Sequence, residues 1–213
     1  MIKSKLCFLK EKKWIIFFSL LFFFCFFAKT ILQKGTFLFD QTIFDSLEKI
    51  KSNQVTTIFK MITNLGSFPV LIIFCLLIYL NTSTRKYGNL VVMNLGISTL
   101  LNRLLKLLFA RERPIGIALI EEAGYSFPSG HSMISMAYFG FLIYLIYHEK
   151  IPNISKAIFT VLGSLMILAI GISRVYLGVH YPSDVIGGFL VSIAYLIVFT
   201  HLINIYKKNR NGV

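Results

Sequence analysis

Long apolar stretches alternate along the chain with short segments that carry Lys, Arg and other polar residues. A transmembrane helix needs about 20 mostly apolar residues. Six stretches approach or exceed that length: residues 14–33, 56–80, 88–110, 131–148, 155–174 and 184–206. The pattern predicts an all-α polytopic membrane protein, a bundle of six transmembrane helices. We expect residues 1–213 to form a single membrane-embedded domain.

Two segments modify this simple plan. Between the first two stretches, residues 37–54 alternate apolar and charged positions, with Ile43, Leu47 and Ile50 on one face of a short amphipathic helix. Such a helix lies along the membrane interface. Within the second stretch, Gly66, Ser67 and Pro69 are expected to distort the helix.

Composition and charge placement support a membrane environment. The chain is 56% hydrophobic and 15% charged, whereas soluble domains carry roughly 25% charged residues. The net charge of +13 could suggest nucleic acid. However, Lys and Arg occur in short clusters between apolar runs, which is typical of topology signals. We therefore expect no nucleic-acid partner.

The cation clusters also predict an orientation. Lys-rich or Arg-rich segments occur at the N-terminus, at residues 85–86, at residues 150–156 and at residues 207–210. If six helices alternate, these segments share one side, and the positive-inside rule makes that side cytoplasmic. Residues 34–55, 111–130 and 175–183 then face outward, although they also contain cations such as Lys34 and Arg111. We expect a multi-pass plasma-membrane protein with both termini cytoplasmic.

Three polar clusters fall at the outward ends of the predicted helices. The first is Lys106-x6-Arg113-Pro114, and Arg103 precedes it in the same apolar stretch. Seven residues span nearly two helical turns, so Lys106 and Arg113 would share a face if the helix continued. Charges inside a membrane segment usually face a polar cavity. A pair of cations that snorkels to the interface is the alternative reading.

The second cluster is Pro128-Ser129-Gly130-His131, directly before the fourth apolar stretch. Exposed amides at a helix N-terminus favour an anion. Ser129 would add a hydroxyl donor, and Gly130 would let the backbone approach closely. An interfacial turn with an incidental histidine remains the alternative.

The third cluster is Ser173-Arg174-x5-His180-x3-Asp184. Pro182 suits the first turn of a new helix, which places Asp184 at that helix's N-terminal end. A carboxylate there can hold Nδ1–H of His180 and leave Nε2 free to attack. It could equally serve as a helix cap.

Taken together, the clusters bring cations, histidines and hydroxyls to one membrane face, as a phosphate site requires. Asp184 stands alone in the sequence there, so we expect no metal ion and no other cofactor.

The ordered set of three motifs resembles the signature of the type 2 phosphatidic acid phosphatase superfamily. That superfamily includes bacterial phosphatidylglycerophosphatase B and undecaprenyl diphosphate phosphatases. The resemblance implies that His180 attacks phosphorus to form a phosphohistidine, that Asp184 orients His180, and that His131 protonates the leaving oxygen. It implies phosphate binding by Lys106, Arg113, Ser129, Gly130 and Arg174. Pro114, Pro128 and Ser173 would support these residues.

The resemblance also implies a substrate class and leaves rivals open. A lipid phosphate or diphosphate is expected, with undecaprenyl diphosphate favoured and phosphatidylglycerophosphate or phosphatidic acid next. A phosphotransferase would carry the same motifs. A lipid or ion transporter is the non-enzymatic alternative, because intramembrane charges can also line a pathway.

Overall fold

The computed structural model describes the backbone of residues 2–81 and 84–210, and side chains from residue 12 to residue 209 within those ranges. The described residues form eight α-helices. Their bounds are α1 Ile2–Lys34, α2 Leu38–Glu48, α3 Asn53–Leu65, α4 Phe68–Leu80, α5 Arg85–Phe109, α6 Gly130–Tyr147, α7 Asn153–Tyr176 and α8 Pro182–Arg210.

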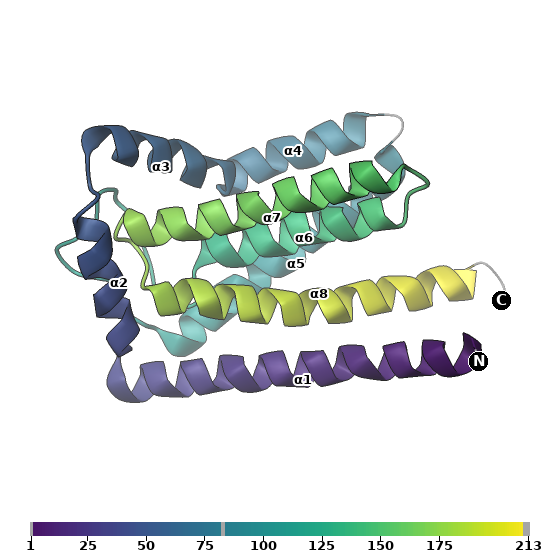
Figure 1. The fold of residues 1–213 in the computed structure, drawn as a ribbon, viewed down its shortest axis with the longest axis horizontal. Helices are drawn as coiled ribbons and strands as arrows, with labels where there is room; N and C mark the ends of the chain where they lie inside the picture. The colour runs from purple at the N-terminus through teal and green to yellow at the C-terminus, as the bar shows by residue number, and fades with distance from the viewer. Residues whose placement is uncertain (1, 82–83, 211–213) are drawn as a thin grey trace.

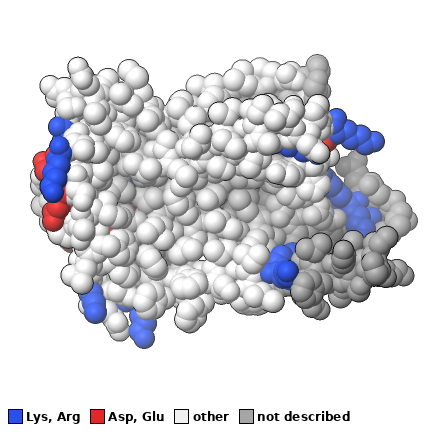
Figure 2. Space-filling view, in the orientation of Figure 1, with Lys and Arg blue, Asp and Glu red and all other residues white. Residues whose placement is uncertain are grey.

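The predicted membrane plan is confirmed. Five of these helices are long and apolar enough to cross a membrane, and α3 with α4 can form a sixth span. The long helices run side by side, with both chain ends at one end of the bundle (Figure 1). On the face shown in Figure 2, the coloured Lys, Arg, Asp and Glu side chains lie toward the two ends, and a broad white band without them separates the ends. The protein is a multi-pass membrane protein.

The sixth span is broken where the sequence predicted a distortion. α3 and α4 meet at an angle of 50°. Gly66 ends α3 and Ser67 precedes α4, whose first turn contains Pro69. A Cβ at Gly66 would lie 2.6 Å from Cγ2 of Ile170, so α7 approaches too closely there for any larger residue.

The short helix α2 lies across the end of the bundle opposite the termini (Figure 1). It corresponds to the amphipathic helix predicted within residues 37–54. Its buried residue is Asp40, with 2% of its surface exposed. A nearly fully buried carboxylate requires polar partners, and these turn out to belong to the candidate site.

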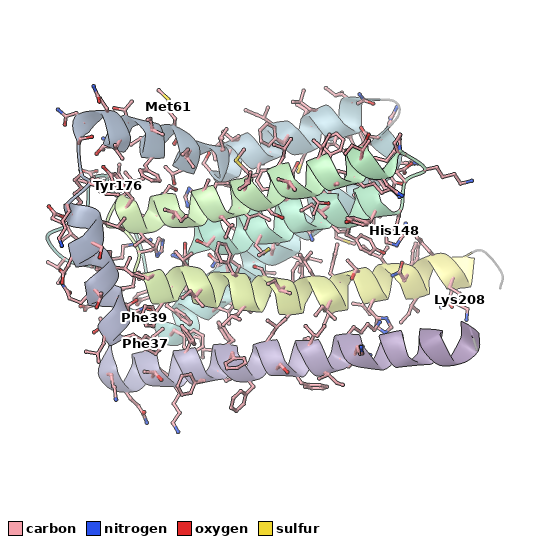
Figure 3. The ribbon with its side chains drawn as sticks, viewed as in Figure 1. Phe37, Phe39, Met61, His148, Tyr176 and Lys208 are labelled. Atoms are coloured by element: carbon pink, nitrogen blue, oxygen red, sulfur yellow. The ribbon has the colours of Figure 1, made fainter. Side chains whose placement is uncertain are left out.

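Two apolar clusters support the polar end of the bundle. Phe24, Ala28 and Ile31 follow helical spacing on α1 and pack with Phe127 from the segment before α6. Tyr176 at the end of α7 stacks on Phe59 of α3, with ring centroids 4.2 Å apart. Figure 3 shows Tyr176 beside α3 at this end, whereas His148 and Lys208 lie at the end with the termini.

Candidate active site

The three motifs meet at the end of the bundle covered by α2. Lys106 lies in the last turn of α5, His131 in the first turn of α6, Arg174 in the last turn of α7, and Asp184 in the first turn of α8. Arg113 and His180 lie in the connecting segments. The structure therefore brings together residues that span nearly 80 positions of sequence, from 106 to 184.

His180 contacts Asp184 both directly and through a serine. Nδ1 of His180 lies 3.5 Å from Oδ2 of Asp184 and 3.3 Å from Oγ of Ser126. The Ser126 hydroxyl donates a short hydrogen bond to the same Oδ2. The predicted partnership between His180 and Asp184 is thus present as a contact, with Ser126 completing it.

The other imidazole nitrogen identifies the tautomer. Nε2 of His180 lies 3.1 Å from Nη1 of Arg113. An arginine side chain can only donate hydrogen bonds, so Nε2 accepts one and carries no proton. The proton of neutral His180 then resides on Nδ1, which faces Ser126 and Asp184.

The surroundings keep His180 neutral. Burial lowers the pKa of His180 well below its ordinary value of 6.5, and the positive charges of Lys106, Arg113 and Arg174 lower it further. The side chain has 1% of its surface exposed. A neutral imidazole whose Nε2 carries no proton is the form that can act as a nucleophile.

The side chains of the three motif cations all donate hydrogen bonds to a single loop segment, residues 122–125. Arg174 donates to the carboxylate of Glu122 from Nη2 and to Oγ1 of Thr63, over 2.7 Å, from Nη1. Arg113 donates to the carbonyls of Ala123 and Gly124 at 3.0 and 2.8 Å. Lys106 donates to the carbonyl of Tyr125.

The condition under which Lys106 and Arg113 would share a helical face is not met. α5 does not continue to Arg113 but ends at Phe109, and Ala110 adopts a left-handed conformation with φ of 43°. Arg113 consequently reaches the site from a loop, where it also donates to the carbonyl of Val179 over 2.8 Å. Arg103 is exposed on α5 and lies outside the cluster.

The second motif forms the start of α6 as predicted. Ser129 is the N-cap residue, and its hydroxyl contacts the backbone nitrogen and hydroxyl of Ser132 at 3.5 and 2.9 Å. The Ser129 hydroxyl is thereby used in capping. A Cβ at Gly130 would lie 3.0 Å from Oδ1 of Asn102, so glycine permits α6 to approach α5 closely. His131 lies near enough to Glu122 and Arg174 to interact with their charges.

The supporting motif residues have separate positions. The carbonyl of Pro128 accepts from Nδ2 of Asn102 over 3.2 Å. The Ser173 hydroxyl donates within α7 to the carbonyl of Ile170 over 2.6 Å. Pro114, with Arg113, Val179 and Glu122, lines an open cavity of about 590 Å³ beside the cation cluster.

Sequence reasoning missed a second polar layer behind Asp184. Nη1 of Arg111 lies 2.5 Å from Oδ1 of Asp184 and 2.9 Å from Oγ of Ser183. Asp40 of α2 accepts from the backbone nitrogen and hydroxyl of Ser183, both at 2.8 Å, and lies 3.4 Å from Nη2 of Arg111. The sequence suggested that Asp184 stands alone, but in the structure it is paired with Arg111, which also contacts Asp40.

Glu122 is a further carboxylate that the motifs did not reveal. It lies in the loop between α5 and α6, which also contains Glu112 and Glu121, and no periodic pattern marks it. Among the described residues, no group of three or more His, Cys, Asp or Glu side chains is placed to hold a metal ion.

Comparison with known proteins identifies the family. The sequence model of the PAP2 superfamily matches residues 86–208. Phosphatidylglycerophosphatase B of Bacillus subtilis is 32% identical over 80% of this chain and 86% of its own length. The chain belongs to the PAP2 superfamily. The resemblance inferred from the three motifs is confirmed.

Other PAP2 members agree in sequence and in fold. An undecaprenyl-diphosphatase of Sulfolobus acidocaldarius is 31% identical over 67% of this chain and 69% of its own length. The crystal structure of a transmembrane PAP2-type phosphatidylglycerolphosphate phosphatase from Bacillus subtilis superposes with a TM-score of 0.78 at 29% identity, covering 88% of this chain and 96% of that one. The protein is accordingly a membrane-embedded lipid phosphate hydrolase of the PAP2 superfamily.

Proposed function

We propose that this phosphatase removes the terminal phosphoryl group of a lipid phosphate or diphosphate through a phosphohistidine at His180, without a metal ion. The proposal rests on the unprotonated Nε2 of a neutral, buried His180 that lies beside three cations. Transfer of a phosphoryl group depends mostly on positioning and on electrostatic stabilisation of its equatorial oxygens. Lys106, Arg113 and Arg174 supply that positive charge.

In the first step Nε2 of His180 attacks phosphorus as the bond to the leaving oxygen breaks. The proton on Nδ1 stays directed at Ser126 and Oδ2 of Asp184, so the imidazolium that develops faces a carboxylate. His131, at the start of α6, gives its proton to the leaving oxygen. The Gly130 amide, in the same first turn, contributes a donor to the phosphoryl oxygens.

In the second step water attacks the phosphohistidine. His131 now takes a proton from the water, the P–N bond breaks, and its electron pair returns to Nε2 of His180. Inorganic phosphate leaves, and both histidines regain their starting protonation states. Arg113, which contacts Nε2 of His180 in the structure, turns toward the phosphoryl oxygens in both steps.

The location of the site supports a lipid substrate. The motif residues lie at the ends of membrane helices, where a lipid phosphate would lie while its tails remain in the hydrocarbon. Undecaprenyl diphosphate, which the family resemblance favoured, and phosphatidylglycerophosphate are the leading candidates, and relatives named for each were found. We propose that the termini are cytoplasmic and that the site opens on the extracytoplasmic face. Because Asp40, Thr63 and the motif residues come from both halves of the sequence, the whole chain acts as one catalytic unit.

The decisive experiment measures phosphate release by the purified protein from four substrates: undecaprenyl diphosphate, phosphatidylglycerophosphate, phosphatidic acid and a short soluble diphosphate. The lipids should be hydrolysed at least about tenfold faster than the soluble compound, and His180→Asn should abolish turnover. Wild-type protein quenched in alkaline detergent during turnover should carry an alkali-stable, acid-labile phosphoryl group that His180→Asn lacks. Near-normal turnover by folded His180→Asn would refute the mechanism.

The same preparation separates the rival functions. Addition of an acceptor lipid should leave free phosphate as the main product, whereas a phosphotransferase would yield a phosphorylated acceptor. Transport of lipid across vesicles without phosphate release would indicate a transporter.

A further inference from the structure

The loop tip Glu121–Tyr125 lies over the phosphate site and is held at both ends by backbone hydrogen bonds. Before the tip, the nitrogen of Leu119 donates to the carbonyl of Leu177 over 2.9 Å. After it, the nitrogen of Ser126 donates to the carbonyl of Arg111 over 2.7 Å. The five residues of the tip are exposed, whereas Ser126 is buried. Both backbone hydrogen bonds lie outside the tip, so they do not involve the residues that contact the cations.

Acceptors on the tip engage all three motif cations. The Glu122 carboxylate binds Arg174 through Oε2 and lies 3.9 Å from Nη2 of Arg113 through Oε1. Backbone carbonyls of the tip accept further hydrogen bonds from Arg113 and Lys106, as described above. A carboxylate between two arginines has the geometry and charge with which these side chains would bind a phosphate group. The chain's own anion thus contacts two of the cations to which the proposed function assigns the substrate's phosphate.

The charge on this internal anion is fixed at one. Burial raises the pKa of Glu122, but the charges of Arg174, His131 and Arg113 and the hydrogen bond from Arg174 bring it below its ordinary value. Glu122 is therefore ionised at neutral pH. Any ligand that binds these arginines must displace one negative charge.

We propose that Glu122 is a specificity-determining residue, which excludes singly charged phosphodiester head groups from the site and yields to more highly charged phosphomonoesters and diphosphates. The inference rests on the proposed function. A phosphodiester lipid brings one negative charge, so replacing Glu122 gains no electrostatic energy. A phosphomonoester carries roughly −1.5 to −2 at neutral pH and gains from the exchange. A membrane contains far more phosphodiester lipid than substrate, so an element that disfavours the wrong ligand is useful.

The test measures inhibition by phosphatidylglycerol in mixed micelles of non-ionic detergent and the best substrate of the panel. Raising phosphatidylglycerol should change the KM of the wild type less than about twofold. In Glu122→Gln it should raise the apparent KM about tenfold, because the uncharged amide no longer repels the monoanion. Glu121→Gln makes the same charge change on an exposed neighbour and should behave as wild type. Glu122→Asp keeps the charge and should remain resistant to phosphatidylglycerol.

A second measurement does not depend on turnover. Calorimetric titration of inorganic phosphate into His180→Asn and into His180→Asn/Glu122→Gln should show about tenfold tighter binding to the double variant. Equal phosphate affinity, or equal sensitivity of Glu122→Gln and wild type to phosphatidylglycerol, would overturn the proposal. If wild type releases no phosphate from any lipid, the proposed function fails, and the titration still decides whether Glu122 competes for the anion site.

Discussion

Nη1 of Arg111 lies 2.5 Å from Oδ1 of Asp184, and the two side chains have 5% and 0% of their surfaces exposed. The other carboxylate oxygen, Oδ2, accepts from Ser126 and from the backbone nitrogen of Tyr181 at 2.9 Å. Both oxygens of Asp184 are thereby fixed in place. The orientation of the carboxylate that faces His180 depends on an arginine outside the three motifs.

Replacing Arg111 should therefore impair catalysis more than substrate binding. We expect Arg111→Gln to reduce kcat on the order of tenfold to a hundredfold, with little change in KM. Loss of a residue that orients a catalytic side chain has an effect of this size. Arg111→Lys should restore part of kcat because it keeps the charge. Steady-state kinetics on the preferred lipid would show this. Arg103→Gln, on the exposed face of α5, serves as the control; a rise in KM alone for Arg111→Gln would contradict the positioning role.

Asp40 should matter for stability although it lies far from the motifs in sequence. Asp40→Asn removes the charge beside buried Arg111 and one acceptor for Ser183. Arg111 keeps Asp184 as a partner, but loss of one charge from this buried group destabilises the folded state, so thermal unfolding in detergent should occur at a lower temperature. Asp45→Asn makes the same change on the exposed side of α2, where Asp45 accepts from Gln41. Equal unfolding temperatures for the two variants would contradict a stabilising role for the contacts of Asp40 with Arg111 and Ser183.

The depressed pKa of His180 predicts a specific pH dependence of stability. Between that pKa and 6.5 the unfolded chain binds a proton at this position and the folded protein does not, so acidification favours unfolding. The contribution of neutral His180 to the free energy of unfolding is fully present above pH 6.5. Below pH 6.5 it declines by about 1.4 kcal/mol per pH unit. Denaturation followed from about pH 7.5 to about pH 5 should show a shallower decline for His180→Asn than for wild type. His148→Asn, which removes an imidazole at the opposite end of the bundle, is the comparison variant.

Gly178 should be irreplaceable for a steric reason. Its φ of +71° is left-handed, and a Cβ there would lie 2.2 Å from the carbonyl oxygen of Ile117. The conformation alone costs roughly 1–2 kcal/mol for other residues, and the collision would displace the segment that carries His180. Gly178→Ala should lose most activity and unfold at lower temperature. Gly116 has φ of +79° and no atom within 4 Å of the position that a Cβ would take, so Gly116→Ala should show only the conformational cost and keep its activity.

Much of the fold and the location of the site could be predicted from local sequence. Apolar length identified the spans, and Gly66, Ser67 and Pro69 indicated the bend between α3 and α4. Pro182 and Asp184 marked the start of α8 because proline and acidic residues favour a first helical turn. The motif residues converge because they lie at helix ends, or in the segments that connect those ends, on the same side of the bundle.

The remainder depends on contacts that local patterns do not encode. Lys106 and Arg113 have helical spacing, yet Ala110 ends the helix between them. The sequence predicts that the Ser129 hydroxyl donates to phosphate, and the structure adds that this hydroxyl accepts from the backbone nitrogen of Ser132 as the N-cap of α6. Arg111 meets Asp184 across 73 positions of sequence and Asp40 across 71. Such pairs follow from how the helices pack, so they became visible only with the tertiary structure.

The crosswise helix α2 has a consequence for where damaging substitutions can occur. The region that the superfamily's sequence model matches begins at residue 86, but Asp40 and Thr63, which hold Arg111 and Arg174, precede it. A fragment restricted to the shared region would contain every motif and still lack two of the anchors that fix their geometry. Variation in the first third of the chain can thus alter turnover without touching a signature residue, and a survey confined to the signature would overlook it.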